Sequence, residues 1–140
     1  MDIRLLFANL REIETECLVV FALDHGDKQK NEPKLSPADE ALEKAVAELV
    51  SSGELTGKVA EAVLLHRPQG VKAKRLLVIG CGKAKSFNNA EIRKAAGTAV
   101  RFLKSKMIKS GAIALPQISS PAEDAVRAIT EGSLVADFDP

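Results

Sequence analysis

Five short segments of the chain carry apolar residues in the patterns expected of β-strands. Residues 3–7 alternate imperfectly between apolar and polar side chains, whereas residues 17–22 form an unbroken apolar run typical of a strand buried on both faces. The segments predicted as strands are 3–7, 17–22, 63–65, 75–79 and 111–115. The polar stretch 24–35 contains Gly26 and Pro33 and is predicted to be an exposed loop.

Three segments have helical periodicity and recognisable start signals. Ser36 is predicted to cap a first helix with Pro37 at its first position, and Gly53 is predicted to end it. A second helix is predicted over 89–106, with apolar residues on one side. A third is predicted to begin at Ser120, where Ser120 and Glu123 have the spacing of a capping box.

The predicted order of elements is β-β-α-β-β-α-β-α, which defines an α/β fold. Strands that alternate with helices in the second half indicate a mixed, partly parallel sheet with helices on its faces. No internal repeat or linker interrupts the chain, so residues 1–140 are predicted to form a single domain.

Composition narrows the class of protein. With 46% hydrophobic and 28% charged residues, the chain has the composition of a globular protein. No apolar run approaches the roughly 20 residues that would span a bilayer, so no membrane partner is expected. Cys17 and Cys81 lie in apolar stretches without a CxxC pattern, which indicates reduced thiols in a cytoplasmic protein.

The net charge of +1 conceals a strong asymmetry along the chain. Residues 67–110 hold twelve Lys and Arg against one acid, Glu91. Arg93, Lys94, Arg101 and Lys104 fall on an arc of about 100° on the second predicted helix. Two interpretations stay open: a solvated helix face that meets the acidic helix of a neighbour (Asp39, Glu40, Glu43, Glu48), or a surface that binds nucleic acid through its phosphates.

Gly80-Cys81-Gly82-Lys83 is predicted to form a turn between the fourth strand and the second helix. Neither a Walker A loop nor a dinucleotide fingerprint fits, because Leu77, Ala84 and Lys85 occupy the diagnostic positions. The turn either packs the helix on the strand or binds phosphate through its amides with help from Lys83 and Lys85. The candidate anion-binding residues are therefore Lys83, Lys85, Arg93, Lys94, Arg101 and Lys104.

No catalytic or metal-binding constellation is visible. Asp24-His25-Gly26-Asp27 is more typical of a solvated loop than of a metal site, and His66 stands alone at a strand end. If the chain were a small enzyme, Cys81 would be the candidate nucleophile, with Lys83 and Lys85 lowering its pKa; the alternative is a buried structural thiol.

Three stretches carry a family resemblance. The run from Lys74 to Lys83, the helix 89–107 with its Ile-Arg-Lys-Ala-Ala-Gly97 core, and the run from Glu123 to Leu134 resemble the N-terminal, non-catalytic domain of the leucyl (cytosol) aminopeptidase family. This resemblance implies a three-layer α/β/α fold similar to macro domains. It also implies that the chain is part of a longer protein whose catalytic C-terminal domain is absent here; a stand-alone binding module is the alternative.

The resemblance implies properties of the parent protein that no residue here carries. Members release N-terminal residues, preferably leucine, from peptides with two divalent metals (manganese, zinc or magnesium) in the catalytic domain. They assemble as homo-hexamers, and some bacterial members bind DNA. No catalytic or metal residue, and no cofactor, is transferred to this chain. Macro domains bind ADP-ribose, but no matching glycine pattern supports transfer of that ligand either.

Overall fold

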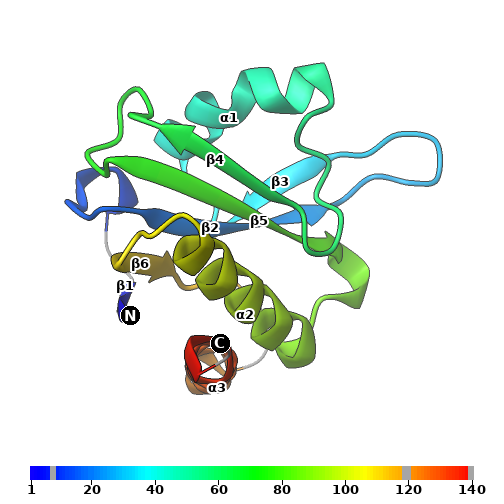
Figure 1. The fold of residues 1–140 in the computed structure, drawn as a ribbon. Coiled ribbons are helices and arrows are strands. Elements are labelled where there is room, and N and C mark those ends of the chain that lie inside the picture. The colour runs from blue at the N-terminus through cyan, green and yellow to red at the C-terminus, as the bar shows by residue number, and fades with distance from the viewer. Residues whose placement is uncertain (7–8, 118–120, 139–140) are drawn as a thin grey trace.

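A mixed six-stranded sheet forms the centre of the computed structural model, which describes residues 1–6, 9–117 and 121–138 (Figure 1). The sheet order is β1-β6-β2-β5-β4, and β3 pairs with β2 outside this path. The strands are β1 (Asp2–Leu6), β2 (Leu18–Asp24), β3 (Pro33–Ser36), β4 (Ala62–His66), β5 (Arg75–Lys83) and β6 (Ser110–Ala114). The helices are α1 (Glu40–Ser52), α2 (Asn89–Ser105) and α3 (Ala122–Phe138), with short 3-10 turns η1 (Leu10–Glu12) and η2 (Ala84–Ser86).

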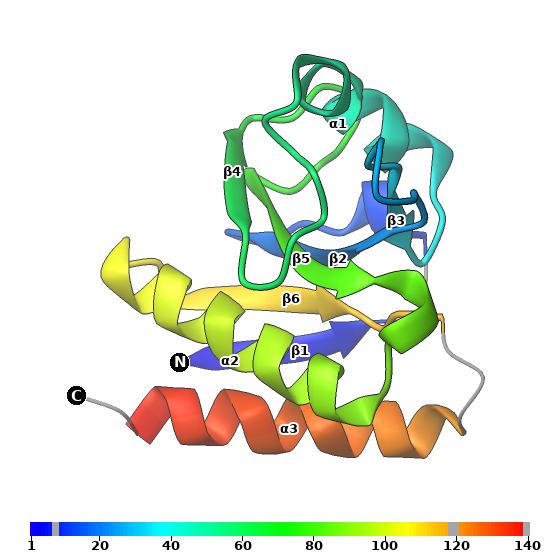
Figure 2. The ribbon, with the colours of Figure 1, turned by 90° about the vertical axis from the view of Figure 1, so that its right-hand side faces the viewer.

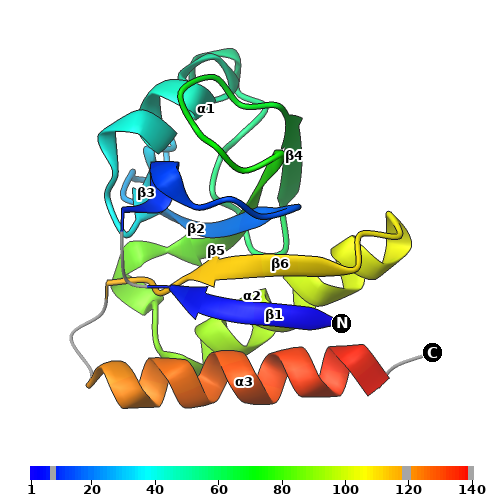
Figure 3. The ribbon, with the colours of Figure 1, turned by 90° about the vertical axis from the view of Figure 1, so that its left-hand side faces the viewer.

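The helices cover the sheet on both faces, which confirms the predicted three-layer α/β/α class. Helix α1 covers one face, while α2 and α3 lie side by side on the other (Figures 2 and 3). Strands β1, β6, β2 and β5 are parallel, and β3 and β4 pair antiparallel with their neighbours. In the part of the chain that the structure describes, no helix is long and apolar enough to cross a membrane.

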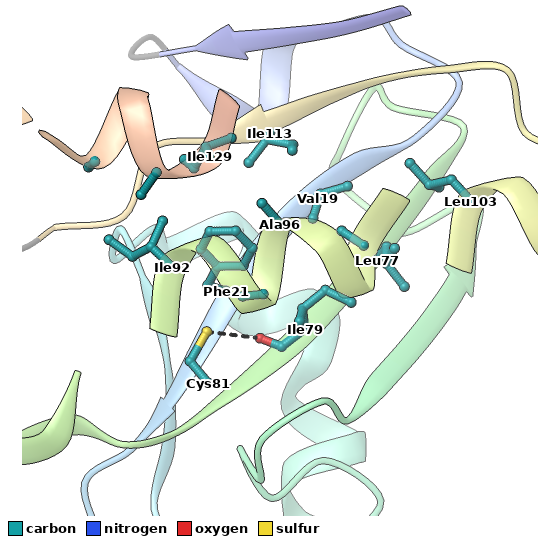
Figure 4. Packing of buried hydrophobic residues seen from close by; sticks show 14 of the residues in the cluster. Val19, Phe21, Leu77, Ile79, Cys81, Ile92, Ala96, Leu103, Ile113 and Ile129 are labelled. Carbon is teal, nitrogen blue, oxygen red and sulfur yellow. Dashed lines mark hydrogen bonds between the residues drawn. The ribbon is translucent and has the colours of Figure 1, made fainter. Parts of the chain in front are cut away.

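Strand β2 supplies side chains to both layers of the core. All seven of its residues are buried, because β5 pairs along one edge, β6 and β3 pair along the other, and helices cover its two faces. Val19 and Phe21 point into the layer beneath α2 and α3 (Figure 4), whereas Leu18 and Val20 point toward α1. The continuous apolar run therefore reflects a strand with no solvent-facing side.

The start of α1 corrects the predicted cap. The helix begins after Asp39, whose carboxylate accepts a hydrogen bond from the Leu42 amide at 3.1 Å. Ser36 lies in β3 instead, because the chain stays extended there to pair with β2, and the hydroxyl of Ser36 accepts a hydrogen bond from the Gln117 amide at 2.8 Å. The predicted stop is confirmed, since Gly53 adopts a left-handed conformation with φ of 81°.

Two loop predictions are wrong for the same physical reason. Residues 33–35 of the predicted exposed loop belong to β3, and Gly80-Cys81-Gly82-Lys83 continues β5 rather than forming a turn. In both places a neighbouring backbone pairs with the segment: β2 pairs with β3, and the Gly80 and Gly82 amides donate to the carbonyl oxygens of Glu61 (2.8 Å) and Gly57 (2.7 Å). A Cβ at Gly80 would overlap the carbonyl oxygen of Lys58, so glycine permits this close approach.

The predicted third helix is present, but its predicted start cannot be compared. Helix α3 runs over Ala122–Phe138, and its predicted cap, Ser120, lies outside the described residues, as does Phe7 at the end of the first predicted strand. Helix α3 packs closely on α2 at Gly132, which is buried. A Cβ at Gly132 would overlap the backbone carbonyl oxygen of Arg93.

Gly132→Ala is expected to destabilise the fold by about 1–3 kcal/mol, because the added methyl forces α3 away from α2. Gly97→Ala is the matched control on α2. Its Cβ would meet only the flexible end of Arg101 at 3.2 Å and the Gly132 carbonyl oxygen at 3.5 Å. This variant should be neutral or more stable by up to about 1 kcal/mol through helix propensity. Urea unfolding of both variants measures the difference, and equal effects would contradict the proposed contact.

Candidate functional site

Two of the candidate basic residues on α2 bind α3 of the same chain. The Arg93 guanidinium contacts the Glu131 carboxylate at 3.1 Å. The Lys104 ammonium donates to the carbonyl oxygens of Ala136 at 3.3 Å and Asp137 at 2.7 Å. These carbonyls belong to the last turn of α3, where a cation also compensates the helix dipole. Part of the basic face of α2 therefore holds the outer helical layer together.

The other two α2 residues, Lys94 and Arg101, are exposed. Lys94 lies 3.7 Å from Glu91 one turn earlier, and the Arg101 side chain lies over Gly97. Acidic side chains thus contact this face from α3 and from α2 itself, whereas the acidic helix α1 lies across the sheet (Figure 3). Binding of an external anion by this face stays a prediction.

Lys83, the last residue of β5, and Lys85, two residues further on, occupy different surroundings. Lys83 forms a 2.7 Å salt bridge with Asp24 at the end of β2 and also donates to the Asp27 carbonyl oxygen at 3.3 Å. Lys85 is exposed on η2. The six candidate residues therefore do not act as one group: Lys83 joins two strand ends, while Arg93 and Lys104 join two helices.

In the sequence, Asp24 stands out only as part of a possible metal site, and its pairing with Lys83 was not predicted. Its side chain is only 6% exposed, and its Oδ1 accepts hydrogen bonds from the amides of Gly26 and Glu32, both at 2.8 Å. Burial alone would raise the pKa of Asp24, but the bonds from Lys83 and the two amides outweigh it and lower the pKa to about 2. The parallel register of β2 and β5 places Asp24 beside Lys83. This register cannot be read from the sequence, so the pair could not be predicted.

The glycine-rich segment presents little of its backbone to a ligand. The amides of Gly80 and Gly82 already donate to the 57–61 segment, as described above. The thiol of Cys81, between these two glycines, is also shielded from solvent. Cys81 is 4% exposed, and its Sγ lies 3.7 Å from the Ile79 carbonyl oxygen (Figure 4).

Both cysteines are buried thiols of low reactivity. Burial raises the pKa of Cys81 to about 12, and the nearby charge of Glu91 acts in the same direction. Burial likewise raises the pKa of Cys17 to about 12. The prediction that Lys83 and Lys85 lower the pKa of Cys81 is therefore wrong, and the nucleophilic role depended on it. Desolvation of the thiolate dominates and raises the pKa instead.

The groups considered for metal binding are dispersed. Among the described residues, no three His, Cys, Asp or Glu side chains lie close enough to hold a metal ion. Asp27 accepts hydrogen bonds from the amides of Gln29 at 2.8 Å and Lys30 at 3.0 Å, as in a loop that closes on itself. His66 is exposed at the end of β4.

The arrangement of sheet and helices defines a macrodomain-like α/β protein. The structure is similar to the macrodomain of Mycobacterium tuberculosis DarG, with a TM-score of 0.61 over 98% of this chain and 93% of that chain. At 16% sequence identity this likeness shows the fold alone.

Sequence comparison identifies the family. A family model described as the cytosol aminopeptidase family, N-terminal domain, matches residues 18–139. The chain belongs to the cytosol aminopeptidase family and corresponds to its N-terminal domain. It is 46% identical over 155 aligned residues to the probable cytosol aminopeptidase of Koribacter versatilis and 38% identical over 149 to that of Acidobacterium capsulatum. The two alignments cover 99% and 100% of this chain, but only 30% and 29% of the length of the two relatives.

The Asp24–Lys83 pair should make the fold acid-sensitive. Because the folded-state pKa of about 2 lies below the ordinary 3.8, the stabilisation is complete above about pH 4 and is lost as pH falls through 2. Asp24→Asn should remove about 2 kcal/mol at pH 7 and flatten this acid dependence. Lys83→Met should also destabilise, whereas the matched control Lys85→Met should change stability by less than about 0.5 kcal/mol. Urea unfolding of the wild type and the three variants between pH 2 and 7 measures these changes in stability. Equal effects of the two lysine variants would refute the stabilising role of the Asp24–Lys83 pair.

The two thiols should resist alkylation in the native protein at neutral pH and react together once it unfolds. Protonation and burial both block the thiolate. Thiol titration with and without urea measures this, and Ser51→Cys, at an exposed position on α1, is the positive control that should react at once. Rapid native labelling of Cys81 would revive a nucleophilic role.

Proposed function

We propose that residues 1–140 are a single non-catalytic domain at the N-terminal side of a metal-dependent leucyl aminopeptidase. The observation that carries this proposal is the match of residues 18–139 to the N-terminal domain of the family, together with relatives of which this chain covers about 30%. The larger remainder of the parent protein would then hold the peptidase chemistry.

The parent protein would remove N-terminal residues, preferably leucine, from peptides. Two divalent metals, manganese or zinc, would supply the Lewis acid and the activated water in its catalytic domain. The residues described here do not fit such a centre, because no three potential ligands converge. This chain would therefore position and assemble the catalytic domains, in a homo-hexamer within the cytoplasm.

The surface of α3 supports a role in assembly. Large hydrophobic side chains are exposed at five described positions, and two of them, Leu134 (53%) and Val135 (61%), are adjacent near the end of this helix. Single exposed hydrophobic residues are ordinary, but a neighbouring pair on a helix that lies outermost in the fold (Figure 2) suits contact with another part of the protein.

The test begins with the native gene product. An antibody raised against this domain should detect a band about three times larger than 15.0 kDa in lysate of the source cells. The purified long product should hydrolyse leucine p-nitroanilide with Mn²⁺ and lose that activity to a chelator, whereas the 140-residue chain should be inactive under all metal conditions. A band at 15 kDa, or a long product without peptidase activity, would overturn the proposal.

A further inference from the structure

The turn between β4 and β5 gathers basic side chains around a shallow cavity. This cavity has a volume of about 390 Å³, and four of its eight lining residues are Lys or Arg. We call these four the hairpin cluster: Arg67, Lys72, Lys74 and Arg75. His66 lines the same cavity, and Pro68, Val71 and Ala73 complete it, so no acidic side chain is among its lining residues.

Strand pairing brings these cations together. His66 lies directly opposite Arg75 in the antiparallel register of β4 and β5. The Arg67 amide donates to the Lys74 carbonyl oxygen at 2.8 Å, which closes the loop just beyond this pair. Opposed residues in such a ladder have side chains about 5 Å apart, so charges seven to nine residues apart in sequence lie side by side.

The protein neutralises only part of this charge. Lys72 forms a 2.8 Å salt bridge with Glu12, and Arg75 donates to the Glu16 carbonyl oxygen at 3.5 Å. Arg67 and Lys74 are exposed and form no salt bridge with any residue in the described ranges 1–6, 9–117 and 121–138. Like charges without partners repel one another, so an anion that bridged them would be bound favourably.

A second cavity limits where that anion sits. Lys72 and Lys74, together with Arg4, also line a second cavity, which Asp2, Glu14 and Glu16 share. Their carboxylates disfavour an anion there. The excess positive charge therefore faces the hairpin cavity, where Arg67 and Arg75 add guanidinium groups.

We propose that the hairpin cluster binds a short chain of phosphate groups from a small molecule. Guanidinium and ammonium groups together match phosphate oxygens, which accept several charge-assisted hydrogen bonds. The cavity volume lies within the roughly 300–1,000 Å³ of small-molecule sites. No Phe, Tyr or Trp lines it and its only aromatic ring is the imidazole of His66, so recognition depends mainly on charge. The cluster occupies a single turn, which suits a compact ligand better than a long polyanion.

This site is separate from both the α2 basic face and the glycine-rich segment. It lies at the start of β5, whereas Gly80–Lys83 is at the end of that strand (Figure 1). It also does not depend on the proposed peptidase role, because the experiment uses the 140-residue chain and measures binding alone.

Calorimetric titration with inorganic tripolyphosphate at about 0.1 M salt tests the site. The wild-type chain should bind one equivalent. The double variant Arg67→Gln/Lys74→Gln should bind at least about tenfold more weakly. The matched control Lys28→Gln/Lys30→Gln removes the same charge from the exposed β2–β3 loop and should stay within about twofold of wild type. Urea unfolding of each variant confirms that it is folded.

NMR shift mapping and two further probes separate the possible outcomes. Shifts confined to residues 66–75 support the site, and tighter binding of ATP than of tripolyphosphate would identify a nucleotide as the source of the phosphates. Equal affinity would identify the phosphate chain itself. Absence of saturable binding, equal weakening by the two double variants, or binding of duplex DNA without binding of tripolyphosphate would each overturn the proposal.

Discussion

Complete burial of β2 is the constraint on which the rest of the structure depends. A strand with both edges paired and both faces covered needs neighbours on four sides. Strand β5 pairs with one edge and β6 and β3 with the other, α1 covers one face, and α2 and α3 cover the other. The strand ends in Asp24, a buried carboxylate that Lys83 of β5 partners. The tertiary connections of the domain thus converge on seven residues.

The positive charge of residues 67–110 is divided among three structural tasks. Arg93 and Lys104 bind α3, Lys83 joins two strand ends, and the hairpin cluster surrounds its own cavity. Intramolecular partners compensate the first two groups, whereas part of the third is uncompensated. Segmental charge along a sequence therefore need not form one binding face, because helices and turns carry neighbouring cations to opposite sides of a sheet.

Local signals predicted most elements and few contacts. Periodicity located five strands and three helices, and Gly53 was correctly recognised as a helix stop. The errors at Ser36 and at Gly80–Lys83 arose where a distant backbone pairs with the segment, since a serine or a glycine in an extended strand has the same local signature as a cap or a turn. The pairing of Asp24 with Lys83 and the hairpin cluster were not predicted, because strand register alone brings these residues together.

The amino-acid sequence by itself determined the α/β class, the helical faces and the resemblance to the cytosol aminopeptidase N-terminal domain. These properties follow from periodicity and from motifs read along one stretch of chain. Only the tertiary structure decided which charges pair, that both thiols are buried with raised pKa values, and where unpaired cations gather. Desolvation and Coulomb interactions depend on distances between residues far apart in sequence, and folding alone sets those distances.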